Sequence, residues 1–212
     1  MAGGTGLVGS LVADALARRP DVELSSLVRA PTRPRDRTID FDALVADPAG
    51  TVGPVDVDVG ISCLGTTIRK AESQAAFRRV DQDYVFAVAR SARDNGARQF
   101  ILMSSVGAGG RAFYLRVKGE VEEAVRGLGF ERLDIIRPGL LLGDRAERRV
   151  AERLAQAAMP ILNPLLRGRL EQYAAVPAAA VANAIVQLVG APGAGVHIAH
   201  TREIIGGSDL AG

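Results

Sequence analysis

The chain has 212 residues, of which 48% are hydrophobic and 24% charged, and its formal net charge is +2. This length suits one domain with a substantial core, and the basic residues are interleaved with acids, which argues against a nucleic-acid-binding patch. A single cysteine excludes a disulfide framework, and we find neither a membrane-spanning apolar run nor a signal peptide. We therefore expect a cytoplasmic protein that acts on a small molecule and has no nucleic-acid or membrane partner.

The first predicted element is a helix over 7–16, directly behind a glycine-rich turn. Gly4, Gly6 and Gly9 satisfy the pattern G-x-G-x-x-G, while Gly3, Gly6 and Gly9 satisfy G-x-x-G-x-x-G. Such glycines allow a tight turn, close approach of the backbone to a pyrophosphate, and packing of the helix against a sheet. The positive end of the helix then faces the anion. A flexible, glycine-rich terminus is the alternative interpretation.

Only Met1 and Ala2 precede this turn, although a dinucleotide-binding sheet begins with a strand of about five residues near its centre. A missing first strand would leave unpaired backbone groups in the core, at about 1–3 kcal/mol for each unsatisfied group. We expect a truncated first strand here, and a natural protein that begins several residues upstream with an apolar β-forming segment.

Further along the chain, patterns typical of strands and helices alternate. Strands are expected at 23–28, 38–41, 55–64, 99–105, 133–136 and 196–199, and helices at 74–95, 113–128, 147–158 and 181–189. This alternation predicts an α/β fold, a doubly wound parallel sheet of the Rossmann type, in which ligands bind at the carboxyl ends of the strands. We expect one domain over 1–212, in which residues from about 140 to 212 form a small substrate-capping region.

The residue at the end of the second strand determines the preference between NAD and NADP, and an acidic residue there binds the ribose hydroxyl of NAD. Arg29 stands at this place and no acid is beside it. An arginine can pair bidentately with a 2′-phosphate. NADP(H) is therefore favoured over NAD(H), with Arg33 or Arg35 as possible helpers, although Arg29 is also compatible with an ordinary surface position.

Tyr114 and Lys118 are the strongest catalytic candidates. They are four residues apart on a predicted helix and share one face. A tyrosine hydroxyl ordinarily has a pKa of about 10, and a fixed ammonium nearby stabilises its phenolate. Ser105 ends a predicted central strand and can hold a substrate oxygen, with Ser104 as its nearest competitor. Alternatively, Tyr114 is a core residue and Lys118 a solvated one.

Six segments carry a family resemblance: GGTGLVG, SCLGTT, VDQDY, FILMSS, YLRVKGEVE and IIRPGLLLGDR. Through them the chain resembles the short-chain dehydrogenase/reductase superfamily, in its atypical NAD(P)-binding branch, and is similar there to the Tat-interacting-protein-like oxidoreductases. The similarity spans residues 3–145 and continues more loosely to about Val189.

The resemblance implies a bound NADP(H) and a Ser-Tyr-Lys site at Ser105, Tyr114 and Lys118. The implied cofactor-binding residues lie in the glycine turn, in the loops after the strands and in the catalytic helix: Gly3, Thr5, Gly6, Leu7, Val8, Arg29, Cys63, Leu64, Gly65, Thr66, Ser104, Tyr114, Lys118, Pro138, Gly139 and Leu140. Cys63 is then a cofactor-loop residue and not a nucleophile. The gap between Ser105 and Tyr114 is short compared with well-studied reductases of the superfamily.

These observations predict an NADP(H)-dependent oxidoreductase of the short-chain type. It would reduce a carbonyl or a similar small electrophile by hydride transfer, with Tyr114 as the proton donor. A non-catalytic NADP(H)-binding sensor or interaction regulator is the alternative, and an epimerase or dehydratase that recycles NAD is a weaker third. We expect a monomer or homodimer and no metal site, because His197 and His200 have no partner set. Tyr173 is expected to be buried or at an interface.

Overall fold

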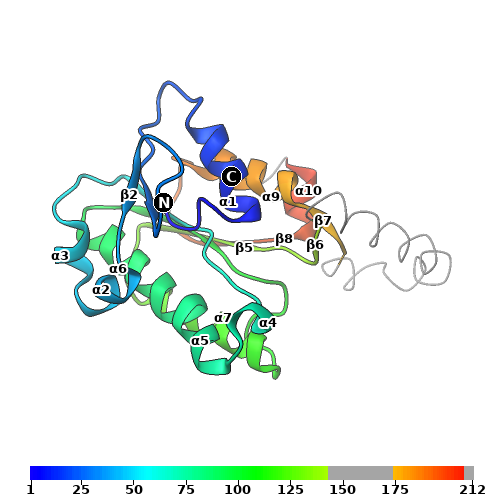
Figure 1. Ribbon diagram of the computed structural model, residues 1–212. Helices are drawn as coiled ribbons and strands as arrows, with labels where there is room; N and C mark the ends of the chain where they lie inside the picture. Colours follow the sequence, from blue (N-terminus) through cyan, green and yellow to red (C-terminus); the bar gives the residue numbers. More distant parts are fainter. Residues whose placement is uncertain (143–173, 208–212) are drawn as a thin grey trace, which may run out of the picture.

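A parallel sheet runs through the middle of the protein, and helices cover both of its faces (Figure 1). The computed structural model describes residues 1–142 and 174–207. The sheet is formed, in chain order, by β1 (Ser26–Val28), β2 (Asp36–Thr38), β3 (Val59–Ser62), β4 (Gln99–Met103), β5 (Arg132–Arg137) and β8 (Gly195–His200). Its spatial order is β2-β1 and β3-β4-β5-β8, with Ala2 bridging β1 and β3. The predicted doubly wound α/β fold is confirmed.

Ala2 takes the position of a strand between β1 and β3. It forms parallel bridges to Leu27 on one side and to Ser62 on the other, and it is fully buried. The Ala2 N–H donates to the Ile61 carbonyl at 2.8 Å, and the Leu27 N–H donates to the Met1 carbonyl at 2.8 Å. Met1 and Ala2 thus join the two halves of the sheet through backbone hydrogen bonds. Two residues are enough to pair with both β1 and β3, although the sequence left this pairing open.

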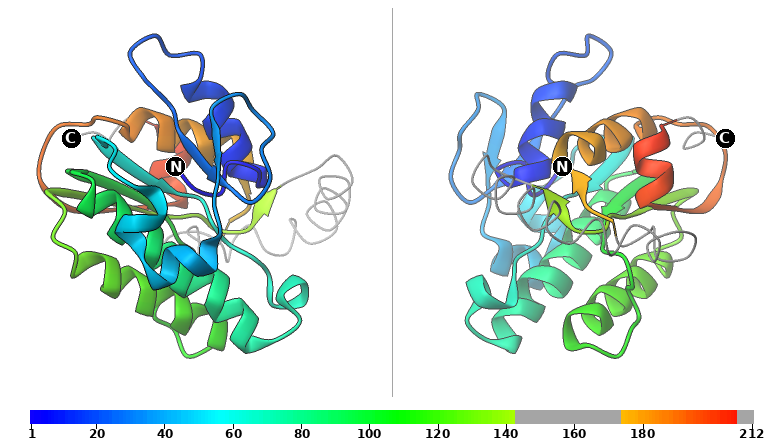
Figure 2. Two further views of the ribbon diagram at one scale, coloured as in Figure 1. Left: turned by 60° about the vertical axis from the view of Figure 1, so that its left-hand side comes forward. Right: turned by 90° about the vertical axis from the view of Figure 1, so that its right-hand side faces the viewer.

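The helices form two layers. One face of the sheet carries α1 (Leu7–Leu16), α9 (Ala178–Leu188) and α10 (Thr201–Gly206). The other face carries α2 (Phe41–Ala46), α3 (Pro48–Val52), α5 (Gln74–Arg78), the π-helix η1 (Arg79–Tyr84), α6 (Val85–Asp94) and α7 (Phe113–Arg126). Although far apart in the sequence, α1 and α9 lie side by side (Figures 1 and 2). Short elements complete the described part: α4 (Ile68–Ala71), β6 (Leu141–Leu142) and β7 (Val176–Pro177).

Alternate residues of the central strands feed two separate cores. Ile101 and Ile136 pack with α1 and α9, whereas Phe100, Leu102 and Ile135 pack with α6 and α7. All five side chains are at most 1% exposed. Burial on both faces explains why these strands read as continuous apolar runs in the sequence.

Two predicted strands need correction. The expected strand at 38–41 is wrong at its end, because Asp40 caps a helix: its Oδ1 accepts a hydrogen bond from the Asp42 N–H at 2.8 Å, and α2 begins at Phe41. The expected strand at 55–64 is regular only over β3. The predicted helix at 147–158 lies outside the described residues.

Candidate active site

The glycine turn lies where the winding of the sheet reverses. Gly3 has φ +84°, and a Cβ added there would lie 2.5 Å from the Cys63 carbonyl carbon. A Cβ added at Gly9 would lie 2.1 Å from the Gly3 carbonyl oxygen. The turn therefore touches both the loop after β3 and the first turn of α1, and only glycine permits these approaches. This is the crevice in which doubly wound sheets bind their ligands.

The N-terminus of α1 is built to receive an anion. Gly6 is its N-cap, no side chain caps it, and its first turn contains no acidic residue. The N–H groups of Leu7 and Val8 therefore point out of the helix end together with its positive dipole. Thr5 and Gly6 are exposed at the same place. The turn thus fits the diphosphate of a dinucleotide, as predicted from the glycine pattern.

Three arginines follow β1, and they differ in what they contact. Arg29 comes directly after the strand and is exposed. Arg33 binds the glycine turn itself: its Nη1 donates to the Gly4 carbonyl at 3.0 Å, and its Nη2 lies 2.9 Å from Asp14 Oδ1. Arg35 lies 3.7 Å from Glu23. Of the two predicted helpers, the structure places Arg33 and not Arg35 against the turn.

Lys118 is buried beside the loop that follows β3. Its Nζ lies 2.7 Å from Asp81 Oδ1, and the two side chains are only 4% and 1% exposed. The other carboxylate oxygen of Asp81 accepts the Thr66 N–H at 2.8 Å. A Cβ added at Gly65 would lie 3.7 Å from Lys118 Nζ. One carboxylate therefore joins the ammonium on α7 to the backbone of the predicted cofactor loop.

Tyr114 stands one turn before Lys118 on the same face of α7. Lys118 Nζ lies 5.9 Å from the centre of the Tyr114 ring, and the Phe77 ring packs on the tyrosine at 5.5 Å. The hydroxyl of Tyr114 makes no hydrogen bond within the described part of the chain, and the residue is half-buried. Its hydroxyl is therefore available to a substrate.

Ser104 and Ser105 have different surroundings. Ser104 is buried, and its hydroxyl donates to Glu122 Oε1 at 2.5 Å. Glu122 also accepts from Arg137 Nε at 3.0 Å, so this carboxylate joins the ends of β4 and β5 to α7. The Ser105 hydroxyl is half-buried and donates to its own neighbour, the Val106 carbonyl, at 3.3 Å. A substrate oxygen can take the place of that weak contact more easily than it can displace Glu122.

The loop after β5 is held next to the serines. The Val106 N–H donates to the Pro138 carbonyl at 3.0 Å, and the Gly139 N–H donates to the Thr201 hydroxyl at 3.0 Å. Leu140 is 66% exposed. The segment predicted to flank the nicotinamide thus lies at the carboxyl edge of the sheet with an apolar side chain at its surface.

Cys63 is inert in this arrangement. Burial raises the pKa of its thiol to about 12, so the neutral thiol is the stable form. A thiolate is the form that attacks electrophiles. The neutral, buried thiol argues against Cys63 as a nucleophile, and its place in the cofactor loop stays a prediction.

Sequence reasoning missed Asp81 and Glu122 as parts of the site. Both are acids that fall within a buried helical stripe: Asp81 lies four residues after Phe77 and four before Val85, and Glu122 lies four after Lys118. An acid in such a stripe is rarely buried without a partner, which is a signal that the sequence contained. Asp81 also lies in the π-helix, a conformation that often occurs at functional sites.

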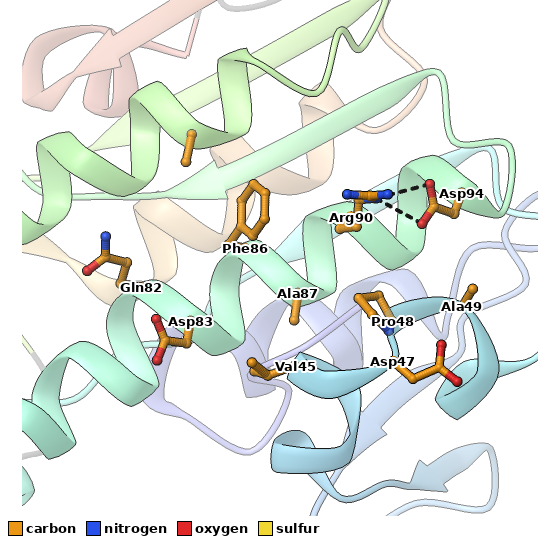
Figure 3. Close-up of a pocket in the computed structure, with 11 residues that line it drawn as sticks. Val45, Asp47, Pro48, Ala49, Gln82, Asp83, Phe86, Ala87, Arg90 and Asp94 are labelled. Atoms are coloured by element: carbon orange, nitrogen blue, oxygen red, sulfur yellow. Dashed lines mark hydrogen bonds and ion pairs between the residues drawn. The ribbon is translucent and has the colours of Figure 1, made fainter.

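A separate hollow of about 520 Å³ opens between α2, α3 and α6 (Figure 3). Its lining includes Asp47, Phe86 and Arg90, and Arg90 pairs with Asp94 at 3.1 Å. None of the predicted cofactor or catalytic residues lines it. We therefore place the site at the glycine turn and not in this hollow.

Sequence comparison now identifies the family. Residues 3–192 match the NAD(P)H-binding family. The chain belongs to this family. It is 44% identical to protein HTATIP2 of Rattus norvegicus over 140 residues, 65% of this chain and 56% of that protein. It is 32% identical to the mitochondrial protein FMP52 of Coccidioides immitis over 170 residues, 71% of this chain and 68% of that protein. The chain thus spans only about half of the rat protein's length. The resemblance to Tat-interacting-protein-like oxidoreductases is confirmed.

A solved structure supports the fold. MoeE5 in complex with UDP-glucose and NAD superposes with a TM-score of 0.64 at 13% identity, covering 97% of this chain and 78% of that one. At such low identity the likeness shows the Rossmann fold alone.

One expectation is wrong: several similar proteins are FMP52 proteins named as mitochondrial, which contradicts a cytoplasmic location. Within the described residues, no helix is long and apolar enough to cross a membrane. Tyr173 lies outside those residues.

Proposed function

We propose that the protein is an NADPH-dependent reductase of the short-chain type that acts on a carbonyl or a similar small electrophile. The observation that carries the proposal is the position of Tyr114, whose hydroxyl has no hydrogen-bond partner among the described residues and which shares a helix face with Lys118 beside the predicted cofactor loop. In the chemistry proposed, Ser105 holds the carbonyl oxygen and Tyr114 gives it a proton, so the phenol O–H bond breaks as the alcohol O–H bond forms. NADPH, when bound, supplies the hydride to the carbonyl carbon.

NADP(H) is proposed over NAD(H) on the basis of Arg29, an exposed guanidinium that follows β1 with no acid beside it. Arg33, which is fixed to the glycine turn, lies in the same segment and can support a 2′-phosphate.

The activity is tested by NADPH oxidation with a panel of aldehydes, ketones and quinones. Tyr114→Phe is expected to lower kcat at least 100-fold, within the range that general acid catalysis contributes. Tyr84→Phe is the matched control, because the Tyr84 hydroxyl is bound to Asp42 at 2.9 Å and belongs to no predicted site. Equal activity of wild type and Tyr114→Phe would exclude Tyr114 as the proton donor.

Cofactor choice is tested by the binding of NADPH and NADH. Arg29→Ala is expected to weaken NADPH binding about tenfold and to leave NADH binding unchanged, as for loss of one charge-assisted contact. Arg35→Ala is the matched control from the same segment, since Arg35 lies by Glu23. An unchanged ratio of the two affinities in Arg29→Ala would refute the assignment.

A non-catalytic NADP(H)-binding regulator is the second candidate. It is favoured by the short gap between Ser105 and Tyr114, which departs from the spacing in well-studied reductases of the superfamily. This candidate predicts tight NADPH binding without turnover of any carbonyl, and binding that Tyr114→Phe leaves unchanged.

A further inference from the structure

Asp81 is the one buried acid that contacts the Lys118 ammonium in the described part of the chain. We propose that Asp81 is a positioning residue that compensates the charge of Lys118 and thereby keeps Tyr114 in its protonated form, the form from which carbonyl reduction starts. This inference rests on the proposed reductase function.

Asp81 holds the Lys118 ammonium in a fixed position. The carboxylate of Asp81 uses both of its oxygens, one on Lys118 Nζ at 2.7 Å and one on the Thr66 N–H at 2.8 Å. Asp81 itself is fully buried and is aimed by the π-helix η1. The ammonium is therefore held at one point between the predicted cofactor loop and the Tyr114 ring.

Asp81 also balances the positive charge of Lys118 next to Tyr114. In a short-chain site, a lysine ammonium without a counter-charge stabilises the phenolate next to it. Here the Lys118 ammonium contacts the Asp81 carboxylate. The electric field at Tyr114 is therefore that of a dipole and not that of a single positive charge. A dipole's field falls off faster with distance, and the phenolate is stabilised less.

Most other charged groups around the pair have an ion-pair partner of their own. The titratable groups on the neighbouring elements include Arg78 on α5, Arg79 and Asp83 on η1, Arg116, Glu120 and Glu122 on α7, Cys63 after β3, and Arg137 on β5, and the exposed Arg111 lies just before α7. Arg116 lies 3.9 Å from Glu120 and shares this carboxylate with Arg78. Arg78 pairs with Glu120, Arg137 with Glu122, and Asp83 with Arg79. Burial raises the pKa of the Cys63 thiol to about 12, which keeps it neutral. Lys118 and Asp81 form the fully buried ion pair beside the Tyr114 ring.

Asp81→Asn is the test, because it removes the charge and keeps the size. The chain contains no tryptophan and three tyrosines, so phenolate formation is read directly from ultraviolet absorbance. Subtracting the titration of the same protein carrying Tyr114→Phe isolates the signal of Tyr114. In Asp81→Asn we expect the Tyr114 phenolate to form at a pH about one to two units lower than in wild type, the effect of removing one negative charge within roughly 9 Å of the ring at an effective dielectric constant of about 20.

Asp83→Asn is the matched control, since it removes an exposed acid from the same π-helix, and it is expected to leave the titration unchanged. Kinetics give a second readout: the alkaline limb of the pH–rate profile for carbonyl reduction moves to lower pH in Asp81→Asn by the same interval. A uniform loss of activity with an unmoved profile and an unmoved titration would overturn the inference and leave Asp81 a structural role.

The two proposals fail separately. If wild type reduces no carbonyl, the proposed function fails, while the phenolate titration still tests Asp81 without any substrate. If wild type reduces carbonyls and the titration of Asp81→Asn does not move, only the inference fails. Should Asp81→Asn not unfold cooperatively, Asp81→Ser replaces it, and failure of both to fold overturns the positioning role.

Discussion

Gly9→Ala tests whether the glycine turn is built as described. A Cβ at this position would lie 2.1 Å from the Gly3 carbonyl oxygen, 2.8 Å from the Gly3 carbonyl carbon and 3.2 Å from the Cys63 Cβ. Two of these atoms are backbone, so the turn has to move away from the helix. Overpacking of this kind costs about 3 kcal/mol, at the upper end of the usual range.

The higher helix propensity of alanine offsets part of this cost, about 1 kcal/mol, because Gly9 lies inside α1. The net loss in the free energy of unfolding is therefore about 2 kcal/mol. For a chain of this size, such a loss lowers Tm by about 4–8 °C. Thermal and urea unfolding of the protein without cofactor measure both quantities.

Gly6→Ala is the matched control. A Cβ there meets only the Gly3 carbonyl oxygen at 3.4 Å, and Gly6 has φ −80°, which alanine adopts freely. We expect stability within about 0.5 kcal/mol of wild type, but weaker NADPH binding, because the added methyl group occupies the approach of the diphosphate. A destabilisation of Gly6→Ala equal to that of Gly9→Ala, or a loss below about 0.5 kcal/mol in Gly9→Ala, would refute the packing argument.

Three further predictions concern titratable groups. Burial lowers the pKa of the Met1 ammonium from 8.0 to about 6. Since the unfolded chain binds more protons between these values, the 212-residue chain should gain about 2 kcal/mol of stability as pH rises from 6 to 8. Urea unfolding across this range checks the sign, and a flat profile contradicts it. The Cys63 thiol, with its pKa raised to about 12, should react with iodoacetamide at pH 8 at least about 100-fold more slowly in the folded than in the unfolded protein. Glu122→Gln breaks buried contacts to two neighbouring elements and should cost about 3 kcal/mol in unfolding free energy, whereas Glu123→Gln, 77% exposed, should cost less than about 0.5; equal effects of the two would contradict the buried network.

The sequence alone predicts the elements whose signals are local. The helix from Leu7 to Leu16 has the predicted bounds, because a glycine turn precedes it and apolar residues recur at helical spacing. The strand that begins at Gln99 is an apolar run buried on both faces, which few other structures produce. Tyr114 and Lys118, two rare residues four apart in the sequence, lie on one helix as predicted, and their catalytic role stays a prediction.

What only the tertiary structure decided are contacts between residues far apart in the chain. Asp81 reaches Lys118 across 37 positions and Thr66 across 15, because a π-turn and the packing of two helices bring them together. Helical spacing places Asp81 among buried residues, but it does not tell which residue pairs with its carboxylate. The same holds for Ala2, a single residue that closes the sheet because β1 and β3, more than 30 residues apart, both hydrogen-bond to its segment. Periodicity determines the elements, but burial and charge pairing across the fold determine what the site can do.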